Sequence, residues 1–279
     1  MPANYQIAET VTHGGITVDL LEWREFSGLT DPRALELMAA IQLAKMPLRQ
    51  IRLTLQQQSS AILEAGGLQF SAGTFDVENR IPFAGTIKRV FGSMVSGVKL
   101  FRPRYNGIGE LWLQPAFHNF LIISLNNNSI VVENGMFLCC DAGVEISTKM
   151  LPTISSALFS GESLFQTMLS GTGFVVLSSP VAQSEIVKIA IKPGQRIQVD
   201  GQFVLLRTAG VNFSVAKSAR TWFGTATSGE GLMQTFEGHG HVWVAPTLPT
   251  YNYLGGLSDP MAIAAEAMAA AAAERKKRK

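Results

Sequence analysis

The sequence predicts an all-β fold, a β-sandwich or prism-like domain of three repeated antiparallel modules. Composition is the first observation: only 16% of the 279 residues are charged, 47% are hydrophobic and 26 are glycine. Such a mixture is typical of many short strands joined by tight turns. The second observation is a recurring segment in which a glycine pair, an apolar run and a proline follow in order: GIGELWLQP (107–115), LSGTGFVVLSSP (169–180) and GHGHVWVAP (238–246).

Each glycine-pair segment is apolar on both faces of the strand that it predicts, which is expected of a strand buried on two sides. Aligned by the second glycine, the apolar positions are Leu111, Val175 and Val242, then Trp112, Val176 and Trp243, then Leu113, Leu177 and Val244. The prolines that follow predict the strand ends, because proline cannot donate a ladder hydrogen bond. An apolar pair upstream of each segment predicts a hairpin that turns at the glycines.

A second unit also occurs three times, beginning near residues 51, 121 and 187. In each copy an alternating strand leads through a polar turn to an acid, a glycine and an Ala-Gly dipeptide. The acids are Glu64, Glu133 and Asp200, and the dipeptides begin at Ala72, Ala142 and Ala209. The dipeptides are 70 and 67 residues apart, which agrees with the 64 and 67 of the glycine pairs, so we predict one three-module domain over residues 1–256.

Two stretches interrupt this period, and the first predicts a helical insertion over about residues 30–47. Asp31 is a suitable N-cap, Pro32 suits the first helical position and Pro47 ends the pattern. The apolar stripe of this helix, which predicts packing on the sheet, comprises Leu37, Met38, Ile41 and Ala44.

The second interruption is the chain end, where residues 257–279 predict an alanine-rich helix with a basic tail. Five of the last six residues are basic, and without these six the chain has 18 basic and 20 acidic side chains. The body therefore lacks the positive field on which nucleic-acid binding depends, and we predict no specific nucleic-acid partner. The tail has three interpretations: a disordered solubilising end, a helix that joins copies of the protein, or a basic anchor giving weak contact with a membrane surface.

The two cysteines, Cys139 and Cys140, are adjacent, and a disulfide between them would be strained. They follow an apolar run, so we expect structural residues, one in the core and one near its surface. The N-terminal residues show no secretory or transit signal. A cytoplasmic location is therefore the expectation.

The glycine-pair segments, above all ALFSGESLFQTMLSGTGFVVLSSP, together with TIKRVFG at 86–92, resemble the altered inheritance of mitochondria protein twenty-four family over roughly residues 51–246. The resemblance implies a fold similar to that of the tryptophan RNA-binding attenuation protein, built from repeated antiparallel strands. Fungal members of this mitochondrial biogenesis family are linked to inner-membrane organisation, so a mitochondrial location is the alternative expectation. The resemblance supplies no catalytic residues.

His239 and His241 are the candidates for a metal site, because two residues apart on a strand they can present both imidazoles on one face. The matching positions of the other two segments are Ile108 with Glu110 and Thr172 with Phe174, which favours variable surface positions instead. The glycine pairs precede strands, whereas a dinucleotide site requires a helix there. We therefore predict no catalytic residues and no cofactor.

Two further groups of side chains have structural interpretations. Trp112 and Trp243 occupy matching positions, which favours packing over base stacking. Arg102 and Arg104 form a small basic turn without counterparts in the other modules, so no repeated basic groove is predicted.

The function that the sequence predicts is a non-enzymatic scaffold or binding protein, acting through homo-oligomerisation or a protein partner, near a membrane if the tail is an anchor. The alternative is a metal-dependent enzyme or small-ligand binder that uses His239 and His241. Exposed strand edges at the ends of the array support self-association without fixing its stoichiometry, and a protein partner is the other mode of action.

Overall fold

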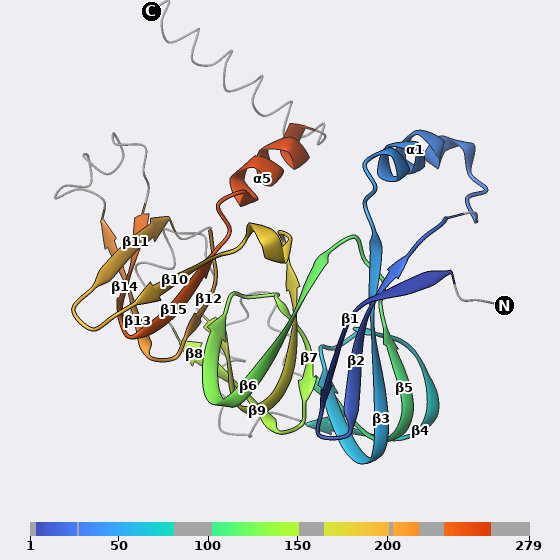
Figure 1. The fold of residues 1–279 in the computed structure, drawn as a ribbon, viewed down its shortest axis with the longest axis horizontal. Helices are drawn as coiled ribbons and strands as arrows, with labels where there is room; N and C mark the ends of the chain where they lie inside the picture. The colour runs from blue at the N-terminus through green and yellow to red at the C-terminus, as the bar shows by residue number, and fades with distance from the viewer. Residues whose placement is uncertain are drawn as a thin grey trace, which may run out of the picture.

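The computed structural model describes residues 4–26, 28–80, 102–150, 165–200, 203–217 and 232–257 (Figure 1). Its first elements are β1 (Tyr5–His13), β2 (Ile16–Trp23), the 3₁₀ turn η1 (Pro32–Ala34), α1 (Leu35–Leu43), β3 (Leu48–Leu63), β4 (Leu68–Arg80) and β5 (Arg102–Leu113). The middle elements are β6 (Asn119–Val132), β7 (Phe137–Asp141), β8 (Val144–Met150), β9 (Phe165–Ser179) and η2 (Gln183–Glu185). The last are β10 (Val187–Ile191), β11 (Arg196–Asp200), β12 (Val204–Thr208), β13 (Val211–Lys217), β14 (Leu232–Gly238), β15 (Gly240–Val244) and α5 (Leu248–Leu257).

The prediction of an all-β antiparallel fold is confirmed. The described strands form a 12-stranded sheet, whose main path runs β1-β2-β3-β7-β9-β6-β12-β15-β10, and a 3-stranded sheet ordered β11-β14-β13. Three strand groups, β1–β5, β6–β9 and β10–β15, stand side by side with β6–β9 in the middle (Figure 1). Among the described strands, none of the first group is hydrogen-bonded to one of the third.

The three groups share one pairing pattern. Apart from the β1–β2 hairpin, which precedes the first strand (β3) of the first group, the last strand of each group pairs on one side with the first strand and on the other with the middle strand. In the first group β5 lies between β3 and β4, and in the second β9 lies between β6 and the consecutive β7 and β8. In the third group every strand is interrupted, so β15 pairs with β10 and β12 while β14 pairs with β11 and β13.

The core follows the alternation that the sequence shows. Ile51, Leu53 and Leu55 on β3 are buried, whereas Arg52 and Thr54 between them are partly exposed, as predicted. On β9 both faces are apolar and Val175, Val176 and Leu177 are fully buried, since hydrophobic clusters lie on either side of the strand. The strand therefore separates two cores, and each of its faces requires an apolar side chain.

Cys139 and Cys140 correct one expectation. Both side chains are fully buried, because β7 also lies between the two cores. Cys139 packs in the cluster shared by the first and second groups, and Cys140 packs in the cluster shared by the second and third. Neither cysteine lies near the surface.

The predicted hairpins at the glycine pairs are wrong. Gly107 and Gly109 lie inside β5, Gly171 and Gly173 lie inside β9, and the third pair lies where β14 gives way to β15. All six have φ values between 117° and 158°, which side chains strongly disfavour. The glycines allow a long strand to bend and cross its neighbour closely, so that one strand serves two parts of the sheet. The predicted strand ends before the prolines are confirmed: β5, β9 and β15 end one or two residues before them.

An N-terminal hairpin was not predicted. β1 and β2 turn at Gly14 and Gly15, both with positive φ, and β2 then pairs with β3 from Ile16 to Trp23. His13 at the turn contacts Asp141 of the second group, with 3.0 Å between Nδ1 and Oδ2. The hairpin thus fastens the first group to the second.

The helical insertion is confirmed in part. The helix α1 begins at Leu35 after the 3₁₀ turn, with Ala34 rather than Asp31 at the N-cap position, and ends at Leu43. Of its predicted packing stripe only Ile41 is buried, while Leu37 is 64% exposed. At the other end of the chain, α5 was not predicted and crosses the expected boundary at residue 256. The predicted alanine helix and basic tail fall on residues 258–279, outside the described residues.

The close crossing at Gly109 gives the first testable prediction. A Cβ atom there would contact the Ala72 carbonyl oxygen and lie 2.7 Å from the Gly73 Cα atom. We expect Gly109→Ala to lower the free energy of unfolding by about 3 kcal/mol, because strain and overlap add. Gly66→Ala is the matched control, since Gly66 has positive φ but open space around its Cβ direction, and should cost about 1 kcal/mol. Equal losses in denaturant titrations would contradict a close crossing.

Candidate functional site: the junctions and open edges of the strand array

The first and second strand groups meet through a short antiparallel junction. At the end of β3, Ala61, Ile62 and Leu63 stand opposite Asp141, Cys140 and Cys139 of β7. The backbone N–H of Glu64 then donates to the Leu138 carbonyl oxygen at 2.8 Å, and that of Ala142 donates to Ser60 at 3.0 Å. Of the six residues that stand opposite one another, all except Asp141 are less than 9% exposed.

The second and third groups meet in the same way. At the end of β6, Ile130, Val131 and Val132 stand opposite Thr208, Arg207 and Leu206 of β12. The N–H of Glu133 donates to Leu205 at 2.9 Å, and that of Ala209 donates to Ser129 at 2.9 Å. One junction geometry is therefore used twice, and the acids of the predicted repeat mark both uses.

Polar side chains close each junction differently. At the first junction, Arg102 Nε is 3.0 Å from Glu64 Oε2, and the Arg102 guanidinium lies 4.9 Å from the centre of the Phe137 ring. At the second, Arg207 is 4% exposed and donates to Gln166 Oε1 at 3.1 Å. Burial lowers the pKa of Arg207, and the Glu133 carboxylate opposes this shift. Arg104 is engaged internally as well, donating to Asn106 at 2.9 Å.

Among the strands that the structure describes, β1, β4, β8, β10, β11 and β13 each pair on one side only, and two of these open edges, on β4 and β11, are equivalent to edges that form the internal junctions. The strand β4 pairs with β5 alone, whereas the middle strands of the other groups also pair with the preceding group. The strand β11 pairs with β14 alone, whereas β3 and β6 also pair with the following group. One end of the array thus offers β4 and the other offers β11, at opposite ends of Figure 1. We call these the β4 edge and the β11 edge.

The β4 edge carries an aromatic and cationic cluster. The Phe70 ring stacks on Trp112 with centroids 5.2 Å apart, and the Arg52 guanidinium lies 5.3 Å from the Trp112 ring centre. Arg52 is held by Asp19, whose Oδ2 lies 2.8 Å from Arg52 Nη2. Trp243 at the matching position packs beneath the Lys188 ammonium at 4.0 Å. Both tryptophans therefore pack against neighbouring side chains of the same chain. The sequence alone does not identify these neighbours.

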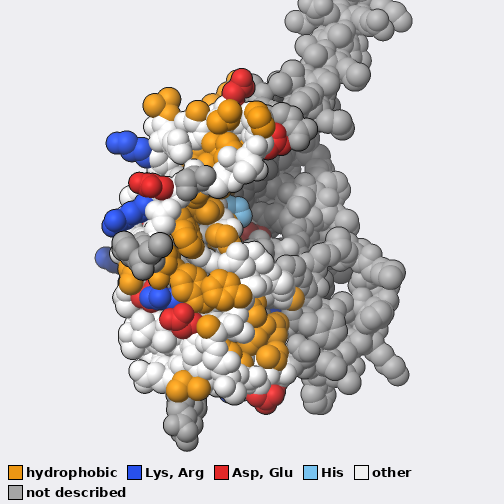
Figure 2. Space-filling model, turned by 90° about the vertical axis from the view of Figure 1, so that its right-hand side faces the viewer, with side chains coloured by type: hydrophobic (Ala, Val, Ile, Leu, Met, Phe, Trp, Pro, Cys, Tyr) orange, Lys and Arg blue, Asp and Glu red, His pale blue; other side chains and the backbone are white. Residues whose placement is uncertain are grey.

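Apolar side chains remain exposed at the same end of the array. Phe70 is 47%, Val77 46% and Ile108 53% exposed. Figure 2 views the molecule from this side and shows hydrophobic side chains gathered over the middle of the face. A contiguous exposed apolar patch is typical of a contact surface.

The structure places His239 and His241 at the bend between β14 and β15. Both are exposed, and their backbone N–H groups bond to the Gly210 carbonyl oxygen at 3.2 Å and to Thr208 Oγ1 at 3.0 Å. Within the described ranges, no three His, Cys, Asp or Glu side chains lie close enough together to hold a metal ion. The pair therefore has no third protein ligand in that part of the chain.

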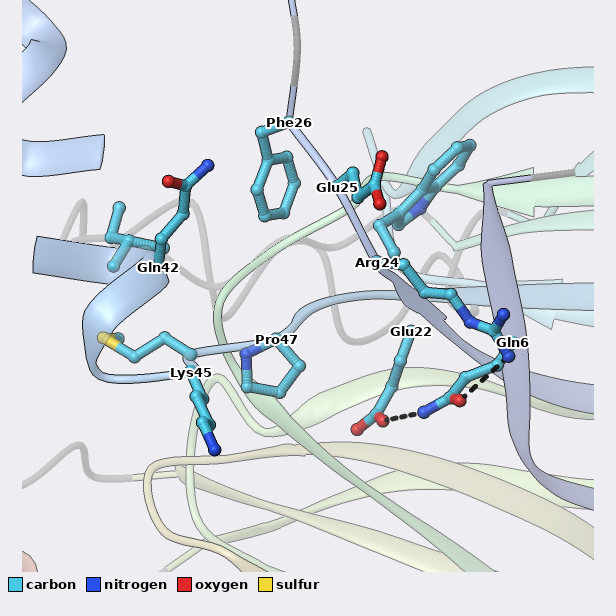
Figure 3. A pocket seen from close by; sticks show the side chains of 11 residues that line it. Gln6, Glu22, Arg24, Glu25, Phe26, Gln42, Lys45 and Pro47 are labelled. Carbon is cyan, nitrogen blue, oxygen red and sulfur yellow. Dashed lines mark hydrogen bonds between the residues drawn. The ribbon is translucent and has the colours of Figure 1, made fainter. Parts of the chain in front are cut away.

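A groove of about 630 Å³ lies between the end of β2 and the last turn of α1 (Figure 3). Gln6 crosses its floor, donating to Glu22 Oε2 at 3.2 Å and accepting from Arg24 at 3.3 Å. Lys45 and Glu25 add one charge of each sign to its walls. Gln6, Glu22 and Arg24 therefore form a chain of hydrogen bonds along one side of the groove. Within the described part of the chain, neither helix is long and apolar enough to span a membrane.

The buried thiols give a pH-dependent prediction. Burial raises the pKa of Cys139 and Cys140 well above the ordinary value. Above about pH 8.5 the unfolded chain loses thiol protons that the native protein keeps, so stability falls as the pH rises, by up to about 1.4 kcal/mol per pH unit for each thiol. A Cys139→Ala, Cys140→Ala variant should show a shallower decline between pH 8.5 and 10 in guanidinium titrations under reducing conditions. Parallel declines would contradict neutral, buried thiols.

Comparisons with known proteins agree with this fold. The solved structure of protein SPYM3_0169 from Streptococcus pyogenes is similar with a TM-score of 0.52 and 20% identity, over 71% of this chain and 88% of that chain. A comparison with curated proteins found no match. The family model described as mitochondrial biogenesis AIM24 matches residues 41–247, which include the strands from β3 to β15. The chain therefore belongs to the AIM24 family, as its glycine-pair segments indicated.

Proposed function

We propose that this protein is a non-enzymatic scaffold that acts by self-association through the ends of its strand array. The observation that carries the proposal is the contrast between the two internal junctions and the two open edges. Equivalent backbone segments are buried and hydrogen-bonded within the chain, but the β4 and β11 edges pair on one side only among the described strands.

An open strand edge presents a row of N–H and C=O groups that can template another strand. Natural proteins commonly protect such edges with charged residues or proline. At the β4 edge, Gln69, Phe70, Ser71 and Ala72 are uncharged and exposed. The edge therefore suits pairing with another strand better than solvation.

The AIM24 family description supports a role connected with mitochondrial biogenesis. A scaffold fits this description because assembly needs surfaces rather than a reaction centre. We propose a mitochondrial setting on this ground, with the cytoplasm, expected from the N-terminal sequence, as the alternative. Weak membrane contact through the basic tail would add to self-association.

Light scattering with size-exclusion chromatography tests the proposal. The full chain, of 30.2 kDa, should run as an oligomer whose mass falls on dilution. Phe70→Asp places a charge on the β4 edge and should weaken association at least tenfold, because burying an unpaired carboxylate is costly.

Leu43→Asp is the matched control. Leu43 is 87% exposed on α1, so the same change in charge and a similar loss of apolar surface occur away from the open edges. This variant should keep the mass of the unmodified protein. A monomer at every concentration, or equal effects of the two variants, would refute self-association through this end.

A further inference from the structure

We infer that the β11 edge of one copy pairs antiparallel with the β4 edge of a second copy, with Val199 opposite Phe70, Gln198 opposite Ser71 and Ile197 opposite Ala72. The inference rests on the proposed function and adds its partner, polarity and register. It makes the contact between copies a third use of the junction that occurs twice within the chain.

The middle strands are aligned by a feature of their backbones. Each has a bulge near its start, where one residue is skipped in the pairing with the last strand. The skipped residues are Gln69 in β4, Leu138 in β7 and Leu205 in β12. The residues after the bulge, Phe70, Cys139 and Leu206, then face the equivalent Trp112, Val176 and Trp243. Phe70 is therefore the counterpart of the two residues that lie in junctions.

The first strands are aligned by their acids. Leu63 precedes Glu64, Val132 precedes Glu133 and Val199 precedes Asp200. The pairing within each group agrees, because Ala61, Ile130 and Ile197 face Tyr105, Leu169 and Phe236, each two residues before the first glycine of a pair. Val199 is therefore the counterpart of Leu63 and Val132.

Both internal junctions then give the same register for the third. Leu63 faces Cys139 and Val132 faces Leu206, so Val199 should face Phe70. All three pairs are apolar. The Glu64 and Glu133 N–H groups donate to the bulge residues Leu138 and Leu205, so that of Asp200 should donate to Gln69.

Exposure shows that this third junction is unmade in the single chain. Leu63 and Val132 are fully buried, whereas Val199 is only half-buried. Cys139 and Leu206 are at most 2% exposed, whereas Phe70 is 47% exposed. The two edges lie at opposite ends of the array in Figure 1, so one chain does not join them itself. A second copy supplies each edge with its complement, and the contact is head-to-tail because the two edges differ.

A disulfide trap tests the register. The bonds of Glu64 and Ala142 flank the Ala61–Asp141 pair, which makes it a non-hydrogen-bonded pair with closely spaced side chains. The pair that corresponds to it between copies is Ile197 with Ala72. Ile197→Cys protein mixed with Ala72→Cys protein should form a covalent heterodimer under mild oxidation, resolved by mass spectrometry. Neither variant alone should cross-link efficiently.

Ser71→Cys is the control, because one residue along β4 the side chain points to the opposite face. Its mixture with Ile197→Cys should cross-link at least tenfold less. If Ala72→Cys protein alone forms disulfide-linked homodimers efficiently, the contact between copies is symmetric and not head-to-tail. If light scattering shows an oligomer but the Ile197–Ala72 mixture does not cross-link, the register is wrong while the scaffold stands. If light scattering shows only a monomer, the proposed scaffold function itself is refuted.

Discussion

Backbone hydrogen bonding across the last strand of each group is the constraint on which the rest of the structure depends. The strand β9 illustrates it: β6 occupies one side along the whole length, while β7 and β8 share the other. With both of its edges occupied, β9 leaves any further pairing to its neighbours. The outer edges of the first and middle strands are therefore the only places where one group can join the next, and both junctions form there.

The glycine pairs make that arrangement geometrically possible. A strand that pairs on both sides must bend where its partners diverge, and the bend brings backbones closer than a Cβ atom allows. At Gly238, for example, a Cβ atom would overlap the Gly210 carbonyl oxygen. In the third group the bend interrupts the last strand, which divides into β14 and β15 between the two glycines. Its two halves then belong to different sheets.

The sequence predicted what depends on local chemistry and missed what depends on approach between distant segments. Alternation identified β3, because burial of one face imposes a period of two. The prediction of turns at the glycine pairs is wrong because positive φ occurs both in turns and where two strands approach closely. Only the position of the partner strand tells the two apart. The apolar stripe of α1 predicted packing on the sheet, but only Ile41 of that stripe is buried. An apolar stripe does not indicate which surface the helix will pack against. The sequence predicted open edges at the ends of the array but not which strands provide them, because an edge is defined by the absence of a neighbour.

The side chains at the central junction position explain why the third junction belongs between copies. Cys140 faces Ile62 and Arg207 faces Val131, and both members of the first pair are apolar. Arg207 is tolerated because Gln166 of the neighbouring group meets its guanidinium inside the same chain. The corresponding pair at the open edges is Ser71 with Gln198, and both residues are exposed. These small uncharged polar groups are solvated at little cost before assembly and can hydrogen-bond afterwards, whereas an exposed Cys140–Ile62 pair would favour indiscriminate association. The chain therefore places an apolar central pair where covalent connection guarantees the partner, and an uncharged polar central pair where the partner must be found.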